Sequence, residues 1–310
     1  MQSDRRQPFA ELVEDRRDRG RVSGGVNVQA PEVDVPLGEP LRESLNRRRA
    51  AGDDALRGRV DGGVGQTGVE ERLELGRRTG NAHHRARRQA AEQRAAQRHH
   101  LERIRHVVER FEPGLVSEHL SWSVVDGTYL ADLLPLPMSE EALDVVCKHV
   151  EQTQTHLRRQ ILVENPSTYL RYRHASIPEW EFLATVAERT GCGILCDVNN
   201  IYVSACNHGW EASAYLAALP PEAIGEIHLA GHTVRQLDGG YTLRIDDHSA
   251  RVAPAVWALY GEALARFGPV PTLIEWDTNV PPLEVLLEEA AQATILLERA
   301  EKETRCANAA

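Results

Sequence analysis

Five short apolar runs in this chain end abruptly in acids, amides and histidines. The metal-capable side chains that close these runs are His119, Glu164, Asp197, His228 and Glu275. A buried parallel strand reads as a near-continuous apolar run, and the carboxyl ends of such strands carry the chemistry of a βα-barrel. We therefore predict five strands that deliver imidazole and carboxylate ligands to one rim.

A further pair of candidate ligands follows the segment 241–245. In an extended chain Asp246 and His248 would share one face, whereas the alternative is an exposed acidic turn. With this pair the predicted metal ligands are three imidazoles and four carboxylates: His119, Glu164, Asp197, His228, Asp246, His248 and Glu275. A facial triad needs only three protein ligands, so seven predict more than one metal. Mixed nitrogen and oxygen donors without cysteine favour iron, manganese or zinc.

Other polar residues beside these ends are predicted to support the ligands or to contact substrate. They are Glu118, Asn165, Asn199, Asn200, His208, His232 and Asp277. Adjacent strand residues point to opposite faces, so only one of Glu118 and His119 faces the interior, and we favour His119. The structural alternatives are a hydrogen-bonded core histidine at 119, an arginine partner for Glu164, and plain turn formation at Asn199 and Asn200.

Helical and strand patterns alternate from about residue 101 onward. The predicted helices cover 101–112, 139–158, 178–190, 211–218, 253–267 and 282–301, and the strands between them end at the candidate ligands. Regular alternation of this kind predicts a parallel sheet with crossover helices. The expected fold class is α/β.

Charge divides the chain into two parts. Residues 1–100 hold 20 arginines, no lysine and 16 acids, whereas residues 101–310 hold 16 basic and 30 acidic residues. The acidic part argues against nucleic acid and suits a protein that gathers cations. No apolar stretch is long enough to predict a membrane span or a signal peptide, and five unpaired cysteines suggest a reducing, cytoplasmic location.

The motifs from residue 101 onward resemble, in order, the multinuclear non-heme iron-dependent oxidase family, also called domain of unknown function 692. That family includes the methanobactin biosynthesis oxidase and the bufferin maturases. The matching segments are 115–122 (LVSEHLSW), 132–137 (DLLPLP), 164–167 (ENPS), 191–203 (GCGILCDVNNIYV), 207–209 (NHG), 226–232 (EIHLAGH), 245–248 (IDDH), 256–260 (VWALY) and 273–277 (LIEWD).

The resemblance implies a TIM-type (β/α)8 barrel that holds two or three iron ions at the carboxyl ends of its strands. It implies that dioxygen is used to modify cysteine residues of a ribosomally made precursor peptide, which a separate partner protein presents. The seven ligands named above would then be the iron ligands.

Only the C-terminal five βα units of such a barrel are recognisable, over residues 101–305. Residues 1–100 lack isoleucine, tryptophan and tyrosine and can bury little apolar area, so we expect an Arg-rich segment of low order. Three further βα units and one more histidine ligand would be expected there, so our hypothesis is that this segment is mistranslated from another reading frame.

Two other functions fit the same residues. A divalent-metal barrel enzyme of the xylose-isomerase or endonuclease-IV kind would use similar ligands, although the acidic charge disfavours a nuclease. A non-catalytic remnant is the third reading, because five strands do not close an eight-stranded barrel.

Overall fold

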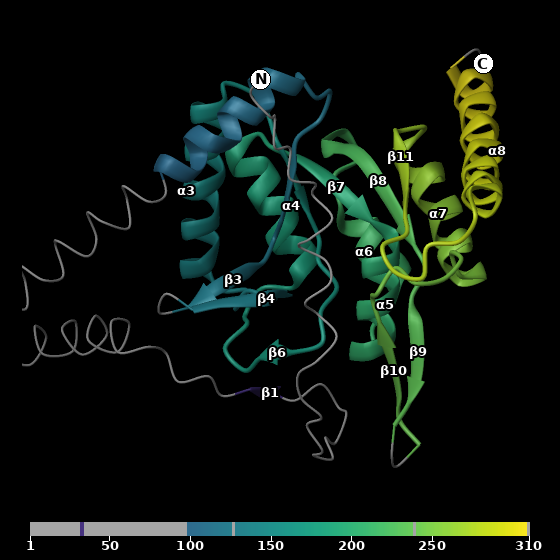
Figure 1. Ribbon diagram of the computed structural model, residues 1–310, viewed down its shortest axis with the longest axis horizontal. Coiled ribbons are helices and arrows are strands. Elements are labelled where there is room, and N and C mark those ends of the chain that lie inside the picture. The colour runs from purple at the N-terminus through teal and green to yellow at the C-terminus, as the bar shows by residue number, and fades with distance from the viewer. Residues whose placement is uncertain (1–31, 34–97, 126–127, 238–239, 309–310) are drawn as a thin grey trace, which may run out of the picture.

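A five-stranded parallel sheet lies at the centre of the protein. The computed structural model describes residues 32–33, 98–125, 128–237 and 240–308 (Figure 1). The strand order is β11-β8-β7-β5-β2. The strands are β2 (Ser117–His119), β5 (Leu162–Glu164), β7 (Gly193–Asp197), β8 (Ile224–Ala230) and β11 (Thr272–Glu275). Every residue of β5 and β7 is buried, as expected of strands covered on both faces.

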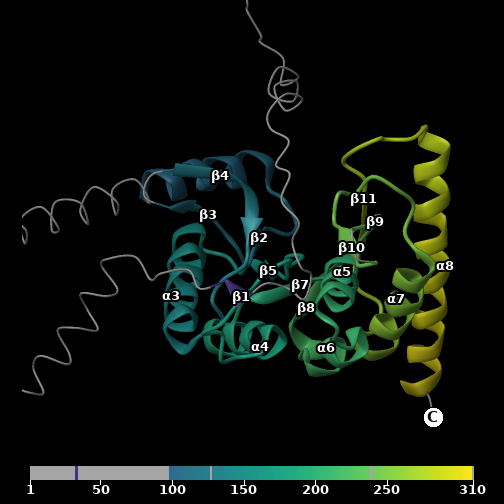
Figure 2. The same cartoon turned by 90° about the horizontal axis from the view of Figure 1, so that it is seen from below.

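Each sheet strand is followed by at least one helix, which gives five βα units. The helices are α3 (Glu140–Leu157), α4 (Glu179–Thr190), α5 (Val198–His208), α6 (Ala212–Ala218), α7 (Pro254–Phe267) and α8 (Leu283–Asn308). Another helix covers residues 98–111, and a 3-10 turn, η3 (Pro221–Ala223), leads into β8. Helices α3, α4, α6, α7 and α8 follow one another around one side of the sheet (Figure 2).

Local signals explain where the helices begin and end. The Ser139 hydroxyl accepts a hydrogen bond from the Ala142 amide at 3.3 Å and caps α3, whose first turn carries two glutamates. Gly191 closes α4 in the left-handed region, with φ of 66°, as the sequence predicted. Gly209 closes α5 in the same way, with φ of 74°.

Short strands extend beyond the carboxyl ends of the sheet strands. The antiparallel hairpin β3 (Trp122–Val125) and β4 (Thr128–Leu134) follows β2, and the hairpin β9 (Thr233–Gln236) and β10 (Thr242–Ile245) follows β8. β6 (Arg171–Tyr172) follows β5 and pairs in parallel with β1 (Glu32–Val33). In Figure 1 these short strands and α5 gather at the lower end of the molecule.

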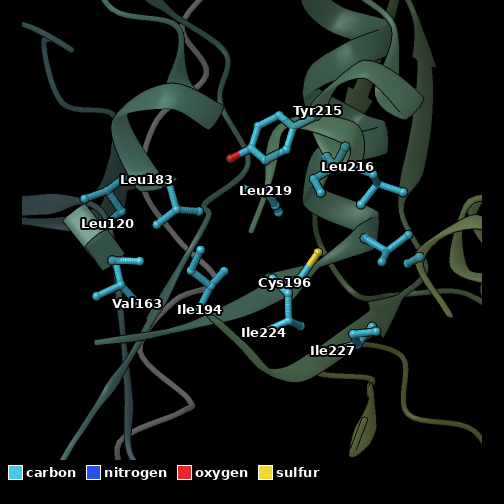
Figure 3. Close-up of a cluster of buried hydrophobic side chains, with 14 of the residues drawn as sticks. Leu120, Val163, Leu183, Ile194, Cys196, Tyr215, Leu216, Leu219, Ile224 and Ile227 are labelled. Carbon is cyan, nitrogen blue, oxygen red and sulfur yellow. The ribbon is translucent and has the colours of Figure 1, made fainter. Parts of the chain in front are cut away.

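The apolar core lies between the sheet and its helices. Figure 3 shows part of it, where Leu183 of α4 and Tyr215 of α6 lie on the same side of the strands as Ile194 and Cys196. These side chains are fully buried or nearly so. Burying a large aliphatic side chain stabilises a fold by roughly 1.5–3 kcal/mol, so this layer holds the strand ends in a fixed register.

The predicted α/β class is confirmed, with five βα units of a TIM-type barrel arranged around a parallel sheet. Among the described residues β2 pairs only with β5, and β11 pairs only with β8, so each leaves one edge open. The prediction for residues 1–100 falls outside the described residues, apart from 32–33 and 98–100, and the domain boundary near 101 stays a prediction.

Candidate metal centre

Four predicted ligands converge at the carboxyl ends of neighbouring strands. Glu164 ends β5, Asp197 ends β7, His228 lies in β8 and Glu275 ends β11. One ligand atom from each residue lies within 4.8 Å of the others. Parallel pairing causes this convergence, because it aligns Asp197 with His228 across β7 and β8.

His119 joins the cluster from the edge strand β2. Its Nε2 lies 3.3 Å from Glu164 Oε2, and its side chain is about one-third exposed, at 37%. Glu118 points away into solvent and accepts a hydrogen bond from the His119 amide at 3.0 Å. The structure therefore places His119, rather than Glu118, toward the cluster, and its role as a metal ligand stays a prediction.

Asp246 and His248 extend the cluster from the loop after β10. His248 Nε2 lies 2.9 Å from Asp246 Oδ1, and His248 Nδ1 lies 3.6 Å from Glu275 Oε2 and 3.0 Å from Asp277 Oδ2. The sequence predicted that Asp246 and His248 would lie together in an extended chain. The chain is not extended there, because His248 has φ of 47° and turns it. Asp277, predicted as a supporting residue, is mostly exposed and touches only this outer imidazole among the predicted ligands.

The short loop that carries Asp246 and His248 packs tightly on the end of β8. A Cβ atom at Gly231 would collide with the carbonyl group of Ala250, which is backbone and cannot move aside cheaply. Glycine at this position therefore lets the loop approach the sheet. The Tyr169 hydroxyl also accepts a hydrogen bond from the Asp246 amide at 2.9 Å.

Asp197 is the most deeply placed ligand. Its Oδ1 accepts a hydrogen bond from the Asn200 amide at 2.6 Å and caps α5, while its Oδ2 is buried without a hydrogen-bond partner. Asn165 holds the backbone of Asp197 on both sides, donating to its carbonyl at 2.9 Å and accepting from its amide at 3.0 Å. Burial raises the pKa of Asp197 well above its usual value, and the nearby Asp246 and Glu164 carboxylates raise it further.

Two imidazoles counter this negative charge. Burial alone would lower the pKa of His228, but the Glu164 and Glu275 carboxylates outweigh it and raise the pKa to about 10. Burial opposes the charged form of His248 as well, and Asp246 raises its pKa to about 10. Protonated imidazoles therefore occupy the electrostatic position that a cation would otherwise take.

One buried ligand atom, Asp197 Oδ2, makes no hydrogen bond. An unsatisfied buried polar atom costs roughly 1–3 kcal/mol, so this oxygen needs an explanation. The buried ring atoms His228 Nδ1 and His248 Nε2 face carboxylate oxygens, at 3.3 and 3.6 Å for His228 and at 2.9 Å for His248. All three atoms belong to types that bind divalent metals. The residues present thus fit a cation, and a mixed nitrogen and oxygen set fits iron, manganese or zinc.

The asparagines after Asp197 are not turn residues. Asn199 and Asn200 lie in α5, so the turn alternative is wrong for both. Asp197 as the cap and Gly209 as the stop are helix signals that could have revealed α5. Asn199 joins two parts of the centre: its Nδ2 donates to Asp246 Oδ1 at 2.7 Å, and its Oδ1 lies 2.8 Å from His232 Nδ1.

The remaining predicted residues lie farther from the cluster. The His208 ring contacts the Thr168 hydroxyl at 2.9 Å, and burial lowers the pKa of His208 to about 4. The His232 ring packs on Tyr202, with 5.4 Å between ring centroids.

One residue near the cluster was not predicted from the sequence. Glu226 Oε1 lies 3.6 Å from His228 Nε2. Residues two apart on a strand share one face, so the position of Glu226 relative to His228 could have indicated this contact.

Among the residues that the structure describes, no helix is long and apolar enough to cross a membrane. The five cysteines are free, and Cys192 and Cys196 are buried core residues.

Several known proteins are similar to this chain. It is 50% identical to a UPF0276 protein of Vibrio parahaemolyticus over 198 residues, which are 64% of this chain and 68% of the relative. It is 51% identical to a UPF0276 protein of Bordetella pertussis over 195 residues, with 63% and 68% covered. A solved structure of a xylose isomerase domain containing protein from Salmonella typhimurium matches at a TM-score of 0.40 and 13% identity, covering 64% of this chain and 80% of that one.

A family model for the RiPP precursor modification enzymes MbnB/TglH/ChrH, which act on ribosomally synthesised and post-translationally modified peptides, matches residues 89–298. That span contains every predicted ligand and more than half of the chain. The chain therefore belongs to the MbnB/TglH/ChrH family of RiPP precursor modification enzymes.

Proposed function

We propose that this protein is a multinuclear iron-dependent oxidase that uses dioxygen to modify cysteine residues of a ribosomally made precursor peptide. The observation that carries the proposal is the meeting of Glu164, Asp197, His228 and Glu275, which offer ligand atoms within 4.8 Å of one another, with Asp197 Oδ2 buried and unpartnered. Family membership supports the peptide substrate.

His119, Glu164, Asp197, His228, Asp246, His248 and Glu275 would hold the iron. Bound iron would supply redox chemistry together with open positions for a cysteine thiolate and dioxygen. The chain itself provides a rigid inner half, where Asn165 fixes Asp197 and Asn199 fixes Asp246. The partly exposed His119 and Glu275 form the accessible side, by which a peptide could reach the centre.

None of the chain's own cysteines belongs to the ligand set. Cys196 lies in β7 and is buried in the core. Burial raises the pKa of its thiol, and the nearby Asp197 and Glu164 carboxylates raise it further. A thiol in this setting stays protonated and is a poor ligand and nucleophile. The thiolate of the reaction would therefore come from the peptide, presented by a separate partner protein.

The test is metal loading followed by turnover. The full chain is purified without oxygen, loaded with ferrous iron, manganese or zinc, and measured for metal content and for oxygen uptake with a cysteine-containing peptide. We expect two or more irons per chain and peptide-dependent oxygen uptake with a change in peptide mass. Manganese or zinc binding without oxygen uptake would favour the isomerase-like alternative, and folded protein that binds no metal would favour the remnant.

The matched variants are Glu164→Gln and Glu181→Gln. Both remove one carboxylate charge, but Glu164 lies in the cluster whereas Glu181 lies exposed on α4. Iron content should fall only in Glu164→Gln. Equal loss in both variants, or in neither, would contradict the ligand assignment.

A further inference from the structure

A pocket of about 350 Å³ lies beside the metal centre, outside the ligand cluster. Four segments form it: the chain after β4, the chain from Thr168 to β6, the start of α4, and the end of α5. Backbone hydrogen bonds from Ser176 and Ile177 to the Met138 carbonyl, at 2.8 and 3.0 Å, join two of these walls. The pocket is therefore a built part of the fold.

One wall of the pocket is aromatic. Trp180 and Trp210 both line it and meet edge to face, with 5.7 Å between ring centroids. Behind them Tyr215, fully buried, stacks on Trp210 at 5.5 Å. Leu136, Leu170 and Ile177 extend the apolar lining. Such a surface suits a large apolar or aromatic side chain.

Strand β6 brings a charged residue to the pocket. Arg171 lines the pocket and is exposed, and Glu179 lines it as well. Arg171 and Tyr172 form β6, which pairs with Glu32–Val33 of this same chain in a parallel register of Glu32 with Arg171 and Val33 with Tyr172. The edge of β6 thus accepts an extended segment, as in recognition by strand addition.

Direct contacts link the pocket to the metal centre. Thr168 lines the pocket four residues after the ligand Glu164, and its hydroxyl contacts His208. The next residue, Tyr169, accepts the hydrogen bond from the Asp246 amide. Asn207 of α5 holds β10 by two hydrogen bonds to the backbone of Arg244, each 2.9 Å. A segment seated in the pocket would therefore lie against Thr168, next to Tyr169, which supports the ligand Asp246.

We propose that this pocket is the docking site for an extended segment of the precursor peptide. The segment adds to β6 in the position of Glu32–Val33, places a large apolar side chain against Trp180 and Trp210, and places a carboxylate at Arg171. The inference rests on the proposed function for the nature of the substrate, whereas the docking geometry rests on the pocket alone.

The test measures binding without turnover. The probe is a fluorescein-labelled, capped hexapeptide that contains one cysteine, one glutamate and one phenylalanine in that order. Its anisotropy is titrated with the full chain under nitrogen without added metal. We expect saturable binding that weakens by about tenfold or more when alanine replaces phenylalanine. No saturable binding, or equal binding of both peptides, would overturn the proposal.

A matched pair of variants locates the binding. Ala175→Trp fills the mouth of the pocket from an exposed position, and Ala214→Trp adds the same bulk at an exposed position of α6 outside the pocket. Probe affinity should fall about tenfold in the first and stay unchanged in the second. Equal affinities, with the melting temperatures confirming that both variants fold, would place the docking site elsewhere.

A charge exchange tests the register. Arg171→Glu should weaken binding of the glutamate probe and strengthen binding of a probe with lysine in place of glutamate. If the Arg171→Glu variant binds the glutamate and lysine probes with the same affinities as the wild-type chain, Arg171 does not contact the bound segment. Failure of the wild-type chain to bind iron would reject the proposed function but leave these binding results intact, so the two failures are distinguishable.

Discussion

The central and edge strands present their ligands in different surroundings. Asp197 and His228 lie on strands that are paired on both sides and are buried, and Asp197 Oδ2 has no hydrogen-bond partner. His119 lies on an edge strand and is partly exposed to solvent, as is Glu275 on the opposite edge. The difference indicates that the centre has a buried, polar inner half that could hold a cation, and an open outer half that water can satisfy.

The largest expected effect follows from Asp197→Asn. The amide keeps the capping oxygen for α5 but removes a buried charge from a cluster of carboxylates, so metal affinity should fall more than about 100-fold. The metal-free protein should melt at a higher temperature, because a neutral amide replaces a buried carboxyl group that lies close to the Asp246 and Glu164 carboxylates. Metal titration and thermal unfolding measure the two effects. Lower stability without metal would show that the inner half does not depend on a cation.

Removal of the clamp on Asp197 should have a smaller effect. Asn165→Ala deletes two buried hydrogen bonds to the Asp197 backbone, which should destabilise the fold by about 2–3 kcal/mol. Metal affinity should fall by about 10–100-fold, as for other residues that orient ligands. Denaturant unfolding and metal titration provide the readouts, and Asn207→Ala on α5 is a control that removes two hydrogen bonds to β10 instead.

His119→Ala tests the outer half directly. Because the His119 side chain is partly exposed and its edge strand is paired on one side only, water can replace the imidazole. We expect a loss of metal affinity of about tenfold and a change in stability within about 0.5 kcal/mol. A loss as large as that in Asp197→Asn would remove the distinction between the two halves.

Glu179, which lies outside the ligand cluster, is a second carboxyl group whose pKa is raised by burial, and we expect a smaller effect on stability there. Burial raises the pKa of Glu179 from 4.5 to about 7, although the Tyr215 hydroxyl donates to it at 2.9 Å and favours the charged form. A carboxyl group with a raised pKa favours the fold below pH 4.5, and this contribution is lost as the pH rises through 7.

Glu179→Gln should abolish that loss. Because Glu179 lies in the first turn of α4, where the helix favours a negative charge, we expect a difference of only about 1–2 kcal/mol between pH 4.5 and 8. Urea unfolding of both proteins at each pH measures it. Parallel stability curves would show that the Glu179 carboxyl is better solvated than its position suggests.

Much of the sheet could be predicted from the sequence, because the apolar runs are long enough for strands and stop at polar residues. Five strands and the candidate ligands at their ends were located in this way, with His119 placed on the side of the cluster. Helix α5 was missed because Asn199 and Asn200 have turn-forming side chains, and only their burial under the β9–β10 hairpin and beside Asp246 outweighs that preference. Both hairpins were missed since short exposed strands carry weak periodicity.

The amino-acid sequence by itself determined which residues could bind metal and that strands would carry them, since residue type and period are local properties. Only the tertiary structure decided which atoms meet. Asn165 reaches Asp197 across 32 positions, and Asp246 is held by Asn199 and Tyr169 from two different βα units. Such contacts depend on strand order and register, which arise from the packing of distant segments rather than from any one stretch of chain.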